Sequence, residues 1–341
     1  MHRCLQLAKK GLGNVAPNPM VGAILVHKDV IIGEGYHESF GSNHAEVNCI
    51  QSVTSNNHEL IKDSTLYVSL EPCNHFGKTP PCTNCIIQHG IKEVVIACLD
   101  SFEKVNGSGI EKLKEAGIKV TIGVLEKEAL ALNIRFFTFH TLKRPYIILK
   151  WAQTNNGMIA GEMKQRIKIS NDSTNKLVHQ WRSQESGIFV GTYTAELDNP
   201  SLTTRLWTGK NPLRIFIDKD LRISQSSNLL DNSTPTLILN RLEEKKIGNT
   251  IFVKYDETKR LIPQLNAILY DKGISSLIVE GGSTLLQSFI NENIWDEARI
   301  ITNKNMEVLN GLDSPIISKK NPIKVESIFH DEIVYYSREG L

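Results

Sequence analysis

The chain has 341 residues, of which 22% are charged, and its formal net charge at pH 7 is +2. This length suits two domains of ordinary size better than a single core. The near-neutral charge argues against a basic surface for nucleic acid. No apolar run approaches the roughly 20 residues that a membrane-spanning helix needs. Because no apolar stretch follows the first residues, we expect no signal peptide, no membrane partner and a cytoplasmic location.

Cysteine usage differs sharply between the two halves of the chain. All six cysteines lie within the first hundred residues, at positions 4, 49, 73, 82, 85 and 98. In a chain of this length without an export signal, such clustering favours metal binding over disulfide bonds. A metal site is therefore expected in the first half.

The first half alternates between strand-like and helix-like segments. Residues 20–26 and 30–36 predict a hairpin that turns at Lys28-Asp29. Ser42 or Asn43 is expected to cap a helix over 44–53. Further strands are expected at 65–70, 93–98 and 118–122, and further helices at 2–11, 109–116 and 126–140.

One more helix is expected between the later cysteines. Thr79 predicts its N-cap, Pro80 suits its first position, and Gly90 suits its end. Cys82 and Cys85 then fall in its first turns. With this helix, the alternation of elements predicts an α/β layer for the first 142 residues or so.

A second α/β pattern begins after Lys143-Arg144-Pro145, a charged stretch that ends in proline. Strands are expected at 146–151, 187–191, 213–218, 236–240, 251–254, 276–280, 297–302 and 332–336, and helices at 172–183, 261–272 and 283–291. We therefore predict an α/β protein of two domains, at 1–143 and 144–341.

The most informative stretch runs from His44 to Cys85. His44-Ala45-Glu46 is followed by Glu71-Pro72-Cys73 and by Pro81-Cys82. Zinc prefers thiolate sulfur and imidazole nitrogen, and His-x-Glu with later Pro-Cys is the pattern of zinc-dependent base deaminases. In that pattern one His and two Cys hold the metal, and water takes the fourth position. Glu46 is then no ligand and moves protons.

The geometry of such a site restricts where the metal lies. Positions i and i+2 of a helix do not share a face, so His44 and Glu46 converge only off the N-terminal end of their helix. There the helix dipole favours thiolates, as it does for Cys82 at its own helix start. The alternative is a closed structural site that adds Cys85 to His44, Cys73 and Cys82. That alternative leaves the neighbouring carboxylate without a role, whereas catalytic zinc keeps one open position.

An open zinc site predicts hydrolytic deamination. Zinc lowers the pKa of bound water from about 15.7 to roughly 7, which lets the water attack an amidine carbon of a heterocycle. Glu46 takes the water proton and delivers protons to the ring nitrogen and the leaving amine. Such a role is typically worth about 10²–10⁴-fold in rate.

The first half resembles one family more closely than deaminases at large. The motifs that carry the resemblance are Pro17-Asn18-Pro19-Met20-Val21-Gly22, Gly33-Glu34-Gly35-Tyr36-His37, His44-Ala45-Glu46-Val47 and Leu70-Glu71-Pro72-Cys73-Asn74-His75-Phe76-Gly77-Lys78-Thr79-Pro80-Pro81-Cys82. They resemble the bifunctional deaminase–reductases of riboflavin biosynthesis. The long insertion between Cys73 and Cys82 differs from the short Cys-x-x-Cys of cytidine deaminases.

This resemblance implies a cytidine-deaminase-like three-layer fold for the first domain. The zinc ligands would be His44, Cys73 and Cys82, with Cys85 outside the site and Glu46 catalytic. The implied substrate is a diaminopyrimidine ribosylamine 5′-phosphate. Its binding residues would be Asn18 and His37 for the ribosyl-pyrimidine, and His75, Lys78 and Thr79 near the phosphate.

The second half resembles the reductase part of the same family. The motifs are Leu149-Lys150-Trp151-Ala152, Arg182-Ser183-Gln184, Gly191-Thr192-Tyr193-Thr194, Asp198-Asn199-Pro200-Ser201-Leu202-Thr203-Thr204-Arg205 and Val279-Glu280-Gly281-Gly282-Ser283-Thr284. They imply a dihydrofolate-reductase-like fold that uses NADPH. A Gly-Gly turn between a strand and a helix presents bare backbone N–H groups to a phosphate.

The implied reductase site divides into two sets of residues. The cofactor residues would be Ala152, Thr194, Asp198, Gly281, Gly282, Ser283 and Thr284. The substrate residues would be Arg182, Leu202, Arg205 and Glu280, with both arginines able to hold the phosphate bidentately. Three positions depart from the family pattern: Met158 where Arg is common, Lys168 where Trp is common, and Lys219 where Ser is common.

We therefore predict an enzyme that deaminates a phosphorylated pyrimidine with zinc and then reduces its ribosyl group to ribityl with NADPH. The small-molecule substrate is expected without a nucleic-acid partner, and a homo-oligomer is expected. One alternative is a pyrimidine or nucleic-acid base deaminase with a non-catalytic second domain. Another is a binding protein with a structural zinc, against which the intact Glu46 argues.

Overall fold

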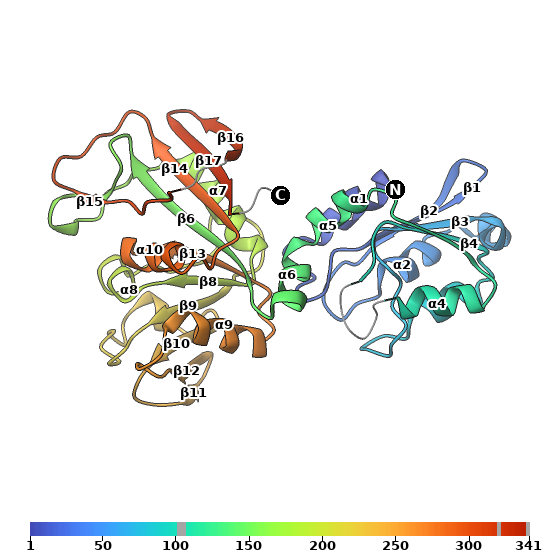
Figure 1. Cartoon of the computed structure of the whole chain (residues 1–341), viewed down its shortest axis with the longest axis horizontal. Helices are drawn as coiled ribbons and strands as arrows, with labels where there is room; N and C mark the ends of the chain where they lie inside the picture. The colour runs from blue at the N-terminus through green and yellow to red at the C-terminus, as the bar shows by residue number, and fades with distance from the viewer. Residues whose placement is uncertain (101–106, 319–321, 339–341) are drawn as a thin grey trace. The chain divides into compact units, whose positions relative to one another are not determined.

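The computed structural model describes residues 1–100, 107–318 and 322–338 (Figure 1). The chain divides into two compact units, Met1–Lys143 and Arg144–Leu341. Each unit has its own sheet and its own apolar core. The last helix before the division ends at Leu142, and the backbone of the next residue, Lys143, is left-handed, with φ +53°.

The first unit is built on a five-stranded sheet in the order β2-β1-β3-β4-β5. The predicted hairpin of β1 and β2 is confirmed, and Lys28 and Asp29 both have positive φ, as a tight hairpin turn requires. β1 is antiparallel to β3, whereas β3, β4 and β5 are parallel. The strands are β1 (Gly22–His27), β2 (Val30–Tyr36), β3 (Thr65–Val68), β4 (Glu93–Ile96) and β5 (Lys119–Ile122).

Helices cover both faces of this sheet. Ala23 and Leu25 of β1 pack with α2, α3 and α4, whereas Ile24 points to the opposite face and packs with α1. This alternation is the two-residue period of a strand, and it confirms the predicted three-layer fold. The helices are α1 (His2–Ala8), α2 (Ala45–Gln51), α3 (Cys82–Gln88), α4 (Ser108–Glu115), α5 (Glu126–Leu132), α6 (Ile134–Leu142) and the 3₁₀ turns η1 (Lys9–Gly11) and η2 (Ser55–Asp63).

Two predicted helix starts in this unit are wrong. α3 begins at Cys82 with Pro81 as its N-cap, and neither Thr79 nor Pro80 belongs to it. The reason is that Pro81 disfavours helical backbone at the residue before it. α2 has His44 as its N-cap, in extended conformation, in place of Ser42 or Asn43.

The single helix predicted over 126–140 is two helices, α5 and α6. They meet at Asn133, whose φ of −101° and ψ of 23° leave the helical region. The Asn133 side chain is buried, accepts a hydrogen bond from Met20 N at 2.8 Å and donates one to Met20 O at 2.9 Å. This long-range pairing breaks the helix, and no local pattern reveals it.

The second unit is built on a ten-stranded sheet in the order β11-β12-β10-β9-β8-β13-β6-β14-β17-β16. In this order, the strands from β12 through to β14 run parallel to one another. The edge strand β11 is antiparallel to β12, and at the other edge β17 is antiparallel to both β14 and β16. The strands are β6 (Tyr146–Thr154), β8 (Gly187–Val190), β9 (Leu213–Ile217), β10 (Thr236–Asn240), β11 (Lys245–Ile247), β12 (Thr250–Lys254), β13 (Ser276–Gly281), β14 (Glu297–Asn303), β16 (Pro322–Ile328) and β17 (Asp331–Ser337).

Helices also cover both faces of the second sheet. Ala298 and Ile300 of β14 share a core with α9 and α10, whereas Arg299 between them lies under Trp181 of α7. This arrangement confirms the predicted α/β fold of the second half. The helices are α7 (Asp172–Gln184), α8 (Thr192–Asp198), α9 (Leu261–Asp271), α10 (Ser283–Asn291) and the 3₁₀ turns η3 (Glu162–Lys164) and η4 (Asn228–Leu230).

Several short elements of the second unit escaped prediction. Helix α8 follows β8 directly, and a small separate sheet pairs β7 (Met158–Ala160) with β15 (Leu312–Asp313). Because β6, β8 and β13 are parallel, their carboxyl ends meet at one edge of the sheet. That edge is where open α/β sheets bind ligands.

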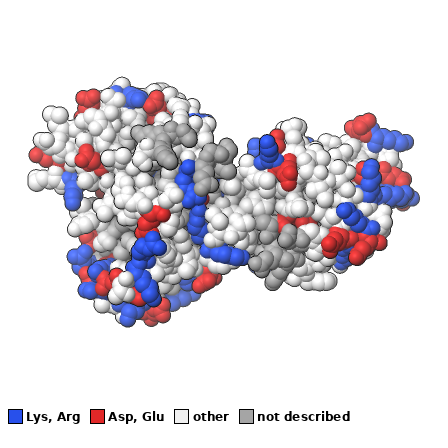
Figure 2. All heavy atoms as spheres, in the orientation of Figure 1, with Lys and Arg blue, Asp and Glu red and all other residues white. Residues whose placement is uncertain are grey.

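Charged side chains of both signs are intermixed on the face of the molecule shown in Figure 2. Within the described residues, no helix is long and apolar enough to span a membrane.

Candidate active sites

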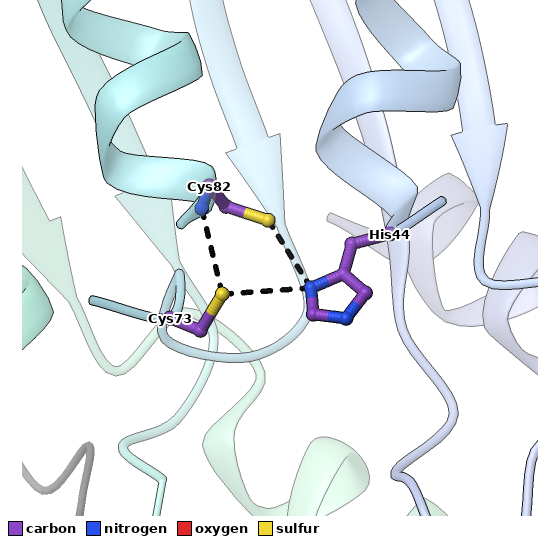
Figure 3. A group of neighbouring side chains, drawn as sticks. All are labelled: His44, Cys73 and Cys82. Atoms are coloured by element: carbon purple, nitrogen blue, oxygen red, sulfur yellow. Dashed lines mark hydrogen bonds between the residues drawn. The ribbon is translucent and has the colours of Figure 1, made fainter. Parts of the chain in front are cut away.

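Three potential metal ligands of the first unit converge (Figure 3). The donor atoms of His44, Cys73 and Cys82 all lie within 4.8 Å of one another. The Nδ1 atom of His44 is 3.5 Å from Cys73 Sγ and 3.3 Å from Cys82 Sγ. One imidazole nitrogen and two sulfurs form the donor set that zinc prefers, so these residues fit a zinc ion with one position left open.

Local backbone structure explains why these side chains meet. His44 is the extended residue just before α2, Cys82 is the first residue of α3, and Cys73 lies on the loop that follows β3. Because His44 precedes the helix, it is not bound by the helical spacing that separates positions i and i+2. The backbone N–H of Cys82 donates to Cys73 Sγ at 3.4 Å, which ties the loop to the start of α3.

Electrostatics at the cluster favour a thiolate. Hydrogen bonding from Cys82 and from His44 lowers the pKa of Cys73 to about 4, although burial opposes this. The hydrogen bond to Cys73 raises the pKa of His44. A stabilised thiolate beside an imidazole suits a metal site, because metal ligands bind in their deprotonated forms.

Glu46 lies beside the cluster without belonging to it. Its side chain is only 3% exposed, and burial raises the pKa of its carboxyl group. It is absent from the group of converging donor atoms. A raised pKa lets a carboxyl group hold a proton more readily than an exposed one, which suits a general acid–base.

Cys85 does not converge with the other ligands. Its Sγ atom lies 3.7 Å from His89 Nδ1, one turn further along α3. Among the described residues, the only cluster of potential metal ligands is His44, Cys73 and Cys82. The closed four-ligand alternative therefore finds no support in the geometry.

Asn18 and His37 lie next to the cluster, as their predicted roles require. Asn18 Nδ2 is 3.1 Å from His37 Nε2, and His37 Nδ1 is 3.0 Å from the Asn43 carbonyl. Since the carbonyl only accepts, Nδ1 carries the proton and Nε2 accepts from Asn18. Burial lowers the pKa of His37, and its ring centroid is 5.3 Å from that of His44.

The loop between Cys73 and Cys82 holds the three residues predicted near the phosphate. Lys78 Nζ lies 3.9 Å from the ring centroid of Phe40, so the loop contacts the segment that leads to His44. Thr79 accepts a hydrogen bond from Gly77 N through its carbonyl. His75 is half-buried on the same loop. Their contact with a phosphate stays a prediction.

Glu71 is a structural residue of this site that sequence reasoning assigned no role. It is 3% exposed, and its carboxylate accepts backbone hydrogen bonds from Asp100, Gly107, Gly109 and Ile110 at 3.0–3.4 Å. It thus fastens the start of α4 to the loop that carries Cys73. The signal was present, because a carboxylate two residues before a ligand in an apolar context needs a partner.

The second unit has a cavity of about 730 Å³ at the carboxyl ends of β6, β8 and β13. Nine of the predicted reductase residues line it, namely Ala152, Arg182, Thr194, Asp198, Leu202, Arg205, Glu280, Gly281 and Gly282. Ser283 and Thr284 do not line it. Six Lys and Arg side chains face two carboxylates in the lining, so the cavity favours an anionic ligand.

A buried ion-pair triad lies in this cavity. Arg182 Nε and Nη2 donate to the two oxygens of Glu280 at 2.7 and 2.8 Å, and Lys150 Nζ donates to Glu280 Oε2 at 3.4 Å. Burial alone would raise the pKa of Glu280, but the two cations lower it to about 2. The carboxylate therefore stays ionised.

This triad holds Arg182, one of the predicted substrate residues. The Nε and Nη2 atoms of its guanidinium both donate to Glu280, and Nη1 donates to the Thr203 carbonyl at 3.2 Å. Nη1 and Nη2 each keep a second N–H, so the contact of Arg182 with a phosphate stays a prediction. Arg205 is exposed and makes no such pair, and burial together with Arg182 and Arg166 lowers its pKa. Arg166 lines the same cavity and had escaped prediction.

Lys150 is another residue of this cavity that had escaped prediction. Burial lowers the pKa of its ammonium group, with Glu280 opposing and Arg182 adding to the shift. The available signal was a single charge within Tyr146-Ile147-Ile148-Leu149-Lys150-Trp151, an otherwise apolar strand. A charge in a buried strand needs a partner and marks a functional site.

The turn after β13 fits a dinucleotide. Gly282 has φ +76°, which favours glycine, and it is the N-cap of α10. A Cβ on Gly281 would lie 3.0 Å from Thr194 Cγ2. A side chain at Gly281 would therefore crowd Thr194, which is another predicted cofactor residue. The first N–H groups of α10 have no partners within the helix and suit a phosphate.

The departures from the family pattern lie mostly away from this cavity. Lys168 lines it and pairs with Asp172 at 2.6 Å. Met158 lies in β7 and Lys219 pairs with Glu257, and neither lines the cavity. Only the exchange at Lys168 therefore touches the cavity.

Comparison with known proteins gives each half a family. Residues 1–98 match the cytidine and deoxycytidylate deaminase zinc-binding region, and residues 145–303 match the RibD C-terminal domain. Riboflavin biosynthesis protein RibD of Aquifex aeolicus (strain VF5) is 39% identical over 99% of this chain and 97% of its own length. The chain belongs to the RibD family. The RibD protein of Bacillus amyloliquefaciens is also 39% identical, over 87% of this chain and 81% of its own.

Solved structures of RibD proteins have the same fold over both units. The diaminohydroxyphosphoribosylaminopyrimidine deaminase/5-amino-6-(5-phosphoribosylamino)uracil reductase of Thermotoga maritima is 36% identical, with a TM-score of 0.90 over 99% of this chain and 97% of that one. RibD of Acinetobacter baumannii has a TM-score of 0.90 at 26% identity, over 98% and 97%. The dihydrofolate-reductase-like fold predicted for the second half agrees with these matches.

Membership of the RibD family makes the chain a deaminase and reductase of riboflavin biosynthesis. Its cofactors are Zn²⁺ and NADPH, and the His/Cys/Cys cluster is the candidate metal site. The alternative of a deaminase with a non-catalytic second domain is therefore rejected.

Proposed function

We propose that this RibD-family enzyme deaminates a diaminopyrimidine ribosylamine 5′-phosphate and then reduces the ribosyl group of the product to ribityl. The name of the Thermotoga maritima relative supports this substrate. The observation that carries the proposal is the pairing of two sites in one chain. One unit holds a His/Cys/Cys cluster beside a buried glutamate, and the other holds a cationic cavity around a buried ion pair.

In the deaminase unit, His44, Cys73 and Cys82 would hold zinc. Zinc supplies the activation of the attacking water. Glu46 would take the two protons of that water in turn and deliver one to the ring nitrogen and one to the leaving amine, so that ammonia departs. Its buried position and raised pKa support this role. Asn18 and His37, fixed in one tautomer beside His44, orient the ribosyl-pyrimidine.

The loop between the two thiol ligands is the proposed place of the substrate phosphate in this unit. Lys78, His75 and Thr79 would contact it. The support is that Lys78 is the one cation of this loop and that the loop packs on Phe40, close to the metal cluster.

In the reductase unit, Ala152, Thr194, Asp198 and the turn from Gly281 to Thr284 would hold NADPH, which supplies the hydride. Arg205 and Arg182 would bind the substrate phosphate, with Arg166 beside them. Leu202 and Glu280 would contact the rest of the substrate. The cationic lining of the cavity supports this assignment.

Lys150 is the proposed proton donor of the reduction. Adding hydride to the carbon of the opened ribosylimine leaves a negative charge on nitrogen, which takes one proton. Lys150 lies in the cavity, and burial lowers the pKa of its ammonium group, which makes it a better acid than an exposed lysine. Glu280 holds Lys150 in place. After Lys150 has given up its proton, Arg182 still compensates the charge of Glu280.

Product analysis tests the whole proposal. The purified, zinc-loaded protein is incubated with the diaminopyrimidine ribosylamine phosphate, with and without NADPH, and the products are identified by mass spectrometry. We expect the deaminated ribosylamino product without NADPH and its ribitylamino form with NADPH. An unchanged substrate in both incubations contradicts the proposal.

Serine variants test the ligand assignment. Cys85→Ser should keep about one zinc per chain and the deaminase activity, because its sulfur lies outside the cluster. Cys82→Ser should lose both. Zinc content is measured by atomic emission on dialysed protein, and Cys98→Ser is a control at another buried cysteine. Loss of metal in Cys85→Ser contradicts the three-ligand site.

Arg205→Ala should raise the KM of the reductase for the phosphorylated substrate, with a smaller effect on kcat. A phosphate-binding arginine contributes binding that is equal in the ground and transition states. Steady-state kinetics on the deaminated substrate measure this, and Arg222→Ala, an exposed arginine paired with Glu196, is the control. An unchanged KM removes Arg205 from the phosphate site.

The oligomeric state and the location in the cell stay predictions. The homo-oligomer is tested by light scattering on the full chain, and the cytoplasmic location by fractionation of the source cells.

A further inference from the structure

Arg214 is a fully buried arginine on β9 that the proposed mechanism does not use. It is 0% exposed, and its five N–H groups all have partners. Nε donates to Thr236 Oγ1, Nη1 to the carbonyls of Ser201 and Asn228, and Nη2 to Asp231 and the Thr234 carbonyl, at 2.8–3.5 Å. Saturating a buried guanidinium in this way joins separate parts of the chain rigidly.

Besides Thr236 of β10, Arg214 contacts two further segments, which it joins. One is the segment Asp198–Arg205, here called the substrate loop, which it contacts at Ser201. The other runs from Ser227 to Thr234 and is here called the support loop. The substrate loop includes the proposed cofactor residue Asp198 and the proposed substrate residues Leu202 and Arg205.

Asn199 makes a second connection between the same loops. Its side-chain oxygen accepts from Ser227 Oγ at 2.9 Å and from the Asn228 backbone at 2.8 Å. Its carbonyl accepts from Asn228 Nδ2 at 2.8 Å. Arg214 and Asn199 therefore fix neighbouring residues of the substrate loop to one support.

The substrate loop needs such support because its backbone is strained. Asn199 has φ +38° and Leu202 has φ +50°, in the left-handed region that L-residues rarely adopt. Such residues persist only where surrounding contacts hold them. Leu202 is 3% exposed in the protein and lines the reductase cavity, so the strained backbone shapes the cavity wall.

We propose that Arg214 and Asn199 are positioning residues of the reductase site, which hold the substrate loop in the conformation that places Leu202 and Arg205 against the substrate. This inference rests on the proposed function of the substrate loop. Neither residue lines the cavity, so both act through the loop. A displacement of about 1 Å at a reacting group can cost roughly 10²-fold in rate, which is the expected scale.

Asn199→Gly is the decisive variant. Glycine accepts the positive φ without strain, so the change removes the two side-chain hydrogen bonds and little else. Asn199→Asp keeps the accepting oxygen and should rescue the loss. Ser226→Ala is the matched control. Ser226 precedes the support loop and is exposed, and it hydrogen-bonds with Ser224. Arg214→Lys, with three donors in place of five, is the second variant.

All variants are assayed on full-length protein at a temperature well below the measured Tm. Deamination by the same preparation reports on the other unit. We expect Asn199→Gly to raise the KM for the deaminated substrate and lower kcat/KM of reduction about 10²-fold. Deamination should be unchanged, and Asn199→Asp and Ser226→Ala should remain near wild type. A purely structural role would lower Tm and leave the kinetics of the folded protein unchanged, which overturns the inference.

The Arg205→Ala variant separates two kinds of failure. If Arg205→Ala impairs reduction while Asn199→Gly and Arg214→Lys do not, the positioning inference alone fails. If none of the three impairs reduction, the substrate loop does not contact the substrate, and the proposed function of that loop fails as well.

Discussion

Glu46→Gln should abolish deamination and keep the metal. We expect about one zinc per chain and a fall in deaminase kcat of about 10²–10⁴-fold, the usual contribution of a general acid–base. Reduction of the already deaminated substrate by NADPH should continue at the wild-type rate, because Glu46 belongs to the first unit only.

The expectation follows from where Glu46 lies. It is buried beside the cluster but is not one of the converging donors, so the amide of glutamine need not disturb the ligands. Burial penalises the ionised carboxyl and raises its pKa. A neutral amide of the same shape fits the same space, so the free energy of unfolding should not fall, but it cannot accept and release a proton.

Three measurements on one preparation check this result: zinc content, deamination and reduction. Glu38→Gln, at an exposed position close in sequence, is the control and should deaminate normally. If Glu46→Gln loses its zinc, Glu46 is a ligand and the assignment fails. If it keeps both zinc and activity, another residue moves the protons.

Local patterns in the sequence predicted most elements of both units. The hairpin of β1 and β2 and the buried strands β8, β10 and β13 follow directly from apolar runs and turn residues. The zinc cluster was predictable for a similar reason. His44, Cys73 and Cys82 come with neighbours, Glu46 and two prolines, that specify one kind of chemistry.

Long-range pairing explains what could not be predicted. Asn133 breaks a helix because it bonds Met20, far away in sequence. Arg182 of α7 had the residue type of a phosphate ligand, and only the fold shows that Glu280 of β13 holds its guanidinium. Composition and spacing indicate that a side chain needs a partner, and only the fold shows which partner it has.

Lys150 and Arg214 share a signal that was available but was not used. Each is a single cation within an otherwise apolar strand. Buried cations are costly unless they are paired, so each marks a place where the fold provides partners. Lys150 pairs with Glu280 in the cavity. Arg214 donates hydrogen bonds to the substrate loop and to the support loop.

Lys150→Met should abolish reduction and spare NADPH binding. The flexible apolar side chain fills the same space, and Glu280 keeps its two hydrogen bonds to Arg182, so the site should stay folded. We expect kcat of reduction to fall about 10²–10⁴-fold, as for the loss of a general acid. NADPH affinity, measured by fluorescence titration, and deamination should be unchanged.

The pH profile of the wild-type enzyme gives an independent test of the same role. A proton donor must be protonated, so reduction should be lost as pH rises through the pKa of Lys150. Burial lowers that pKa below the ordinary value of 10.5, and the alkaline limb of kcat should therefore lie below the one expected for an exposed lysine. Lys164→Met is the matched control, because Lys164 lines the same cavity but lies over the Tyr193 ring at 5.2 Å. If Lys150→Met retains kcat and only raises KM, Lys150 binds substrate and another group delivers the proton.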